Sequence, residues 1–165
     1  MNKVSFSTTL TALGLLLVSA FSAAATVDFT WGDPKQFQDM KYPGGNDARF
    51  QARVIKELEE QFRREAEKLP ADQILSVTVN DVDLAGYIEY FHPGYPFGLR
   101  VIRNIDYPTI DLSYMLKDAN SDVIQSGEGK IKNLGFRNAT LSTLQREPLR
   151  YEVELIKDWY QTEFK

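Results

Sequence analysis

The chain is organised around the segment 99–116, and apolar and polar residues alternate along its second half. Its apolar positions are Ile110, Leu112, Tyr114 and Leu116. A period of two residues is typical of a β-strand with one buried face. A polar turn at 118–121 follows at once, and a second extended run covers 122–132. This pattern predicts a β-hairpin in the middle of the chain.

The second strand of that hairpin carries Gly127 and Gly129, which alternate with Glu128 and Lys130. Because glycine has no side chain, one face of this strand is bare. Such a strand often has a bulge, or a large group packed closely against it. Tyr114 on the facing strand is expected to fill that space.

Two longer segments have apolar residues at the spacing of an amphipathic helix. In the first, 47–68, the apolar stripe consists of Phe50, Val54, Leu58, Phe62 and Ala66. In the second, 148–164, it consists of Leu149, Val153, Ile156, Tyr160 and Phe164. Two further alternating runs, at 26–31 and 74–80, predict strands, and the second run is expected to continue toward residue 84.

These elements follow one another as strand, helix, strand, hairpin and helix. The helix between the first two strands is long enough for a crossover connection. We therefore expect an α+β fold: a single two-layer domain, covering 26–165, whose mixed and mostly antiparallel sheet is built around the central hairpin. Both amphipathic helices are expected to cover one face of the sheet.

The first 25 residues have the pattern of a secretory signal peptide. Lys3 provides a basic start, an apolar run follows, and small residues end at Ala25. We expect cleavage near Ala25 and export to the periplasm. The alternative is a transmembrane anchor, although the apolar run is shorter than the roughly 20 residues that a membrane span needs.

Composition narrows the possible functions. The chain has 19 basic and 23 acidic side chains, a net charge of −4, and it has no basic block. This charge balance argues against nucleic-acid binding and against electrostatic binding to a membrane surface. With no cysteine and one histidine, a structural zinc site is not expected, and neither is a cofactor. The chain is not expected to span a membrane after signal cleavage.

An unusually aromatic stretch lies at 87–98, with the sequence YIEYFHPGYPFG. Its prolines exclude an inner strand, so it is a loop or the irregular tip of a long hairpin. Aromatic rings on a Gly/Pro frame offer contact area for a peptide, a glycan or a partner protein. The candidate binding residues are Tyr90, Phe91, His92, Tyr95, Phe97 and Arg103. The preferred interpretation is structural: the rings fold back and cap the open end of the core.

A second candidate site is polar. It consists of Asp81, Asp83, Asp106 and Asp111, with Arg100 and Arg103 nearby in the sequence. Paired carboxylates perform acid–base chemistry when burial separates their pKa values. The glycine and distant glutamate of a loop-type calcium site are not at the right spacing, so no metal is expected. The structural alternatives are aspartates that cap backbone N–H groups and ion pairs that hold the strand register.

Several segments together resemble a family of exported bacterial proteins catalogued as domain of unknown function 3016. They are FTWxDPxxF at 29–37, DxKY at 39–42, VxDVDLAG at 79–86, RVIRNI at 100–105, PxIDLxY at 108–114 and PLRYE at 148–152. The resemblance covers nearly all of the chain after the signal peptide. It implies a periplasmic or otherwise exported domain of Gram-negative bacteria, and it implies no activity, substrate or catalytic residue.

Three functions remain open from the sequence. The first is a non-catalytic binding or protein-interaction module that uses the aromatic loop and the uncovered sheet face. The second is a carboxylate-dependent, hydrolase-like enzyme built on the aspartates and Arg103. The third is a structural envelope protein whose partner is another copy of itself. The partner in the first case would be a periplasmic protein, a peptide or a glycan.

Overall fold

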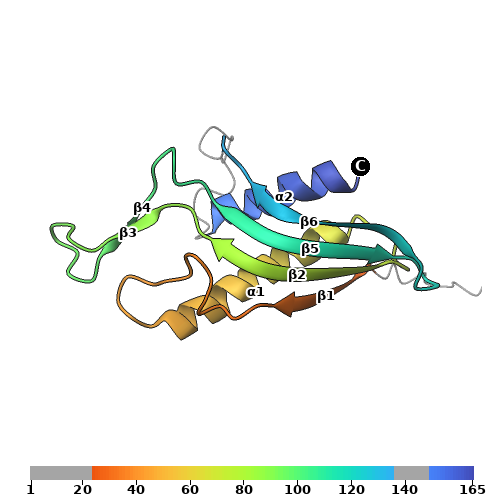
Figure 1. Cartoon of the computed structure of the whole chain (residues 1–165), viewed down its shortest axis with the longest axis horizontal. Coiled ribbons are helices and arrows are strands. Elements are labelled where there is room, and N and C mark those ends of the chain that lie inside the picture. Colours follow the sequence, from red (N-terminus) through yellow and green to blue (C-terminus); the bar gives the residue numbers. More distant parts are fainter. Residues whose placement is uncertain (1–23, 136–148) are drawn as a thin grey trace, which may run out of the picture.

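The computed structural model describes residues 24–135 and 149–165, which form two layers and a projecting hairpin (Figure 1). In chain order the elements are β1 (Thr26–Trp31), α1 (Asp47–Ala66), β2 (Ile74–Asp83), β3 (Tyr87–Glu89), β4 (Leu99–Val101), β5 (Thr109–Lys117), β6 (Val123–Lys132) and α2 (Arg150–Glu163). No helix in the described part of the chain is long and apolar enough to cross a membrane. The predicted signal peptide lies almost wholly outside the described residues.

Four strands form one mixed sheet in the order β1-β2-β5-β6. β1 and β2 are parallel and are connected by α1, whereas β2–β5 and β5–β6 are antiparallel. β3 and β4 form a separate two-stranded hairpin between β2 and β5. The predicted α+β fold, with a central hairpin and a crossover helix, is therefore confirmed.

Both helices lie on one face of the four-stranded sheet (Figure 1). α1 packs against β1 and α2, and α2 also contacts β6. The core between the layers is aromatic at its centre, where the Trp159 ring lies 5.6 Å from Phe62 and 5.4 Å from Tyr114 in edge-to-face contacts. Such contacts add to the stabilisation from burial alone. α2 is therefore part of the core and not an appendage.

A bulge in β2 changes which of its side chains are buried. Before the bulge the buried positions are Leu75, Val77 and Val79. The register shifts between Val79 and Asp81, after which Val82 is buried and Asp83 is half-buried. One extra residue in a strand reverses its alternation. β2 thus continues beyond residue 80, as expected, and turns Asp81 and Asp83 toward the open face of the sheet.

Gly127 on β6 makes room for the Tyr114 ring on β5, as the sequence predicted. A Cβ atom at Gly127 would lie 2.8 Å from Cε1 of Tyr114. The Tyr114 hydroxyl donates to the Glu163 carboxylate at 2.7 Å and accepts from the Gln125 amide at 2.9 Å. One tyrosine therefore connects both hairpin strands to the end of α2.

Both predicted helices are longer than those in the structure. α1 ends at Ala66, two residues before the predicted end. α2 begins at Arg150, and Pro148, the predicted first helical residue, lies outside the described residues. The aromatic stretch at 87–98 is the end of a hairpin, one of the two forms expected for it.

We predict that Gly127→Ala lowers the free energy of unfolding by about 1–3 kcal/mol, because the added methyl group forces the Tyr114 ring or the strand to move. Urea denaturation measures the change. Gly135→Ala is the control, since the nearest atom to its added Cβ is 3.8 Å away. Equal losses in the two variants would contradict close packing of Tyr114 on Gly127.

Candidate functional site

The hairpin tip, defined as residues 90–98, extends away from the two layers at the left of Figure 1. Phe91 is 99% exposed and Phe97 is 70% exposed. Tyr90 and Tyr95 each expose half or more of their surface. The preferred sequence interpretation, that these rings fold back and cap the core, is therefore wrong. The sequence could not reveal this, because ring burial depends on what other segments lie above the ring.

The hairpin tip is held in a defined shape by its own hydrogen bonds. The Tyr95 N–H donates to the His92 carbonyl at 3.1 Å, and the Gly98 N–H donates to the Tyr95 carbonyl at 3.0 Å. Nδ1 of His92 lies 2.9 Å from Oε2 of Glu89, and its ring contacts Tyr95 edge-on at 5.4 Å. Gly98 has φ +91°, a conformation that other residues rarely adopt. The exposed rings are therefore carried on an ordered frame.

Arg100 fastens the base of the hairpin to the rest of the molecule. Its guanidinium donates to both carboxylate oxygens of Asp39, at 2.7 and 3.1 Å. It also donates to the carbonyls of Ala85 and Lys41, at 3.3 and 3.2 Å. Both side chains of the ion pair are less than one-fifth exposed. Partial burial strengthens such a two-pronged pair, because water screens it less.

Glu152 of α2 also contacts the base of the hairpin. Its carboxylate accepts a hydrogen bond from the Ala85 N–H at 2.7 Å, and the residue is only 3% exposed. Burial raises the pKa of Glu152 above its usual value, because the charged form is desolvated. Gly86 follows Ala85 in the chain, and a Cβ at Gly86 would lie 2.4 Å from the Val101 carbonyl oxygen. Only glycine fits where the chain enters the hairpin.

Arg103 lies beside the base of the hairpin and not among the exposed rings of the tip. Its Nε donates to Oδ2 of Asp106 at 2.7 Å, and its guanidinium lies 4.3 Å from the centroid of the Tyr87 ring. Its second contact to Asp106, from Nη2 to Oδ1, is 3.0 Å. This bond is the main cause that holds the pKa of Asp106 below its usual value.

The four aspartates of the predicted polar site lie near one end of β2 and β5. Asp83 and Asp106 line one shallow depression that Lys130 also lines. Asp81 accepts from the Gln38 backbone N–H at 2.7 Å and pairs with Lys130 at 3.6 Å. Asp111 is the β5 partner of Asp81. The structural alternatives of backbone capping and ion pairing therefore describe Asp81 and Asp106.

This depression lacks a second carboxylate that is free to act with Asp83. The pKa of Asp83 is raised above its usual value, mainly by burial and also by repulsion from the charges of Asp39 and Asp81. Both oxygens of Asp106 accept from Arg103, so its carboxylate is committed to that pair. Within residues 24–135 and 149–165, no group of three or more acidic or histidine side chains is placed to hold a metal ion. The arrangement suits a structural ion-pair network.

The open face of the sheet is polar. A hollow of about 380 Å³ on it is lined largely by small hydroxyl side chains and glycine, with Met115 and Glu128. The hydroxyl residues are Ser76, Thr78, Ser113 and Ser126. The large apolar side chain exposed there is Met115, at 38%, so this face is a weaker binding candidate than the hairpin tip.

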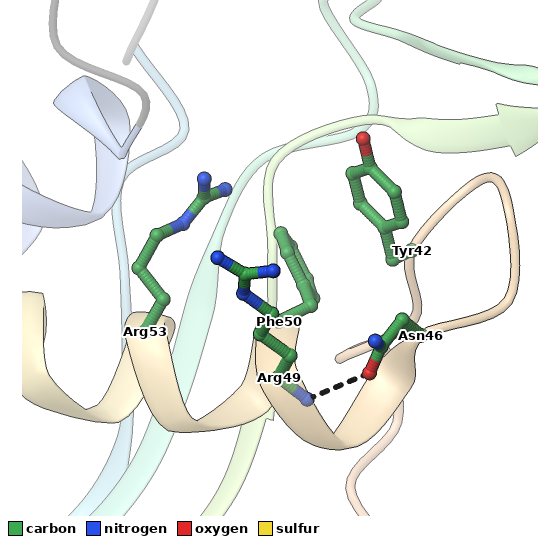
Figure 2. A pocket seen from close by; sticks show the side chains of 5 residues that line it. All are labelled: Tyr42, Asn46, Arg49, Phe50 and Arg53. Carbon is green, nitrogen blue, oxygen red and sulfur yellow. Dashed lines mark hydrogen bonds between the residues drawn. The ribbon is translucent and has the colours of Figure 1, made fainter.

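Sequence reasoning missed a groove beside the first turns of α1. Figure 2 shows Arg49, Phe50 and Arg53 rising from the same side of α1, and Tyr42 completes the lining from the segment before the helix. Sequence reasoning also missed Asp39 and Glu152, which interact with the hairpin base. Their partners are 61 and 67 residues away along the chain, so no local pattern marks them.

We predict that Arg100→Gln speeds amide hydrogen exchange throughout 87–101 by about tenfold or more, because the hairpin loses its partly buried ion pair with Asp39. Arg103→Gln is the matched control. It breaks a pair in which the arginine side chain is 52% exposed, and such pairs contribute about 1 kcal/mol or less. Equal exchange in wild type and Arg100→Gln would show that other contacts hold the hairpin.

We predict that Glu152→Gln reduces the loss of stability as pH rises. With a folded-state pKa raised above 4.5, Glu152 binds more protons in the folded than in the unfolded state between the two pKa values. Its contribution to stability therefore falls as pH rises through that window, and glutamine removes this dependence. Urea denaturation from pH 4 to pH 8 measures it, with Glu154→Gln as control. Parallel profiles for wild type and Glu152→Gln would contradict the raised pKa.

One comparison with known proteins gave a match. The family model described as a protein of unknown function, DUF3016, matches residues 25–162. No curated protein and no solved structure matches significantly. The family match includes every described strand and all but the last residue of α2. It confirms the resemblance seen in the sequence segments, and the chain belongs to the DUF3016 family of proteins of unknown function.

Proposed function

We propose that this chain is an exported, non-catalytic protein-interaction module that binds its partner through the hairpin tip. The observation that carries the proposal is the exposure of four aromatic rings on one ordered projection, with Phe91 99% exposed. Exposed apolar side chains are unremarkable when scattered, but a contiguous group marks an interaction surface.

Burial of these rings against a partner lowers their free energy relative to exposure to water. Fully burying one large apolar side chain contributes about 1.5–3 kcal/mol. The hydrogen bonds within the tip and the Arg100–Asp39 pair at its base restrict the tip before binding. A restricted surface loses less conformational entropy when it binds. Rings on an ordered frame therefore suit binding better than rings on an unstructured loop.

The charges of the tip favour a protein surface over a membrane or a nucleic acid. Between residues 89 and 98 the only ionisable groups besides the tyrosines are Glu89 and His92, which contact each other. This range has no lysine or arginine to attract phosphate. Tyrosine and phenylalanine, by contrast, are enriched in protein interfaces. The signal-peptide pattern of residues 1–25 supports export, and the partner would then be a periplasmic protein.

We predict that a photo-crosslinker at the tip captures this partner. p-Benzoylphenylalanine replaces Phe97 in the full chain, in the native host, because it keeps the phenyl ring and adds a photoreactive benzophenone carbonyl at an exposed position. Ile124 is the control position, since it is also exposed but lies at the opposite end of the sheet. An adduct of defined mass is expected at Phe97 and not at Ile124.

Phe91→Ala is then added to the crosslinking variant and should reduce the adduct about tenfold, as expected when a ring at the centre of an interface is removed. The thermal stability of the chain should not change, because the ring is exposed. Identical adducts at both positions, or none at either, would overturn the proposal. An adduct with the mass of two copies would instead support a structural envelope protein.

A further inference from the structure

We propose that the groove beside α1 is a second binding site, which takes an acidic, extended peptide segment. Arg49 and Arg53 would hold the carboxylate of the peptide, and an apolar side chain of the peptide would enter the inner end of the groove. This site is separate from the hairpin tip, and the proposal stands without the tip.

The groove consists of two neighbouring cavities that have three lining residues in common. The outer cavity, of about 350 Å³, lies over the first turns of α1 and is the one shown in Figure 2. The inner cavity, of about 220 Å³, shares Tyr42, Phe50 and Arg53 with it. Its deeper lining is mostly apolar and includes Leu84, Ala85, Ile102, Leu149 and Tyr151. A cationic entrance thus leads to an apolar end.

The positive charges of Arg49 and Arg53 at the entrance are only weakly neutralised by nearby carboxylates. Among the described residues, Arg49 has no carboxylate within 4.0 Å, and its backbone N–H donates to the capping Asn46. Arg53 lies 3.6 Å from Glu57, and its own side chain remains 54% exposed, so water screens this pair. The Arg53 guanidinium also lies 5.4 Å from the centroid of Phe50. The entrance is therefore positive in a chain whose net charge is negative.

The acidic residues near the inner end do not cancel this charge. Asp39 is committed to Arg100, which also lines the inner cavity. Glu152 lines the same cavity, but its burial raises its pKa and favours the neutral form. An incoming carboxylate therefore meets Arg49 and the partly exposed Arg53 at the entrance, whereas Asp39 and Glu152 behind them are both largely buried. Guanidinium groups bind carboxylates through paired, charge-assisted hydrogen bonds.

The size and lining of the inner cavity point to a peptide. Pockets that enclose a whole small molecule are about 300–1,000 Å³, so this cavity suits a single side chain. An apolar lining does not satisfy the hydroxyl groups of a glycan. A peptide with an acidic residue close to a large apolar residue offers a carboxylate to the arginines and an apolar side chain to the inner cavity.

The test is a selection of random decapeptides displayed on phage, with the full chain as the target. Enriched peptides should contain aspartate or glutamate beside a large apolar residue. Their affinity should fall about tenfold in the Arg49→Gln/Arg53→Gln variant, which loses two charge-assisted contacts. Lys56→Gln/Arg64→Gln is the matched control. It removes the same charge from exposed positions of α1 outside the groove, and affinity should stay within about twofold.

The outcomes separate this inference from the proposed function. The groove site would be overturned if no peptide is enriched, or if the enriched peptides lack acidic residues. It would also be overturned if peptides bind wild type and Arg49→Gln/Arg53→Gln equally. These outcomes hold whatever the crosslink at Phe97 shows. Peptides that lose affinity with Phe91→Ala but not with Arg49→Gln/Arg53→Gln would also overturn it, while supporting the tip. Binding of oligogalacturonate, an acidic glycan, in place of peptides would overturn the choice of a peptide.

Discussion

The ion pair between Arg100 and Asp39 is the interaction on which the shape of the candidate binding surface depends. It joins the hairpin to the segment that precedes α1, and the same guanidinium binds the carbonyl groups where β2 gives way to the hairpin. Glu152 secures that turn from α2 through the Ala85 N–H. A two-stranded hairpin is barely stable alone in water, so these contacts determine its direction.

The segments that carry the family resemblance meet at this junction. Asp39, Ala85, Arg100 and Glu152 come from four of those segments, at 39–42, 79–86, 100–105 and 148–152. The exposed rings of the hairpin tip lie between two of these segments and belong to neither. These four residues thus build the support, and the tip is a surface carried on it. This division is common where a rigid scaffold presents a binding loop.

Two surfaces of different chemistry adjoin on this end of the molecule. The hairpin tip is aromatic and nearly neutral, whereas the groove beside α1 has a cationic entrance. They approach each other at Gly44, where a Cβ would lie 3.9 Å from Cβ of Phe97 and 3.4 Å from the Tyr42 ring. The polar depression around Asp83 is different, because its neighbouring carboxylates are held by ion pairs and backbone hydrogen bonds.

The helices, the central hairpin and the packing of Tyr114 on Gly127 could be predicted from the sequence, because these follow from periodicity and from side-chain size on facing strands. The sequence also identified 87–98 as an unusual segment. The exposure of its rings, the pairing of Asp39 with Arg100 and the groove beside α1 emerge only when the chain is folded. Exposure and long-range pairing depend on segments about 60 residues apart, and no local pattern records which of them will meet.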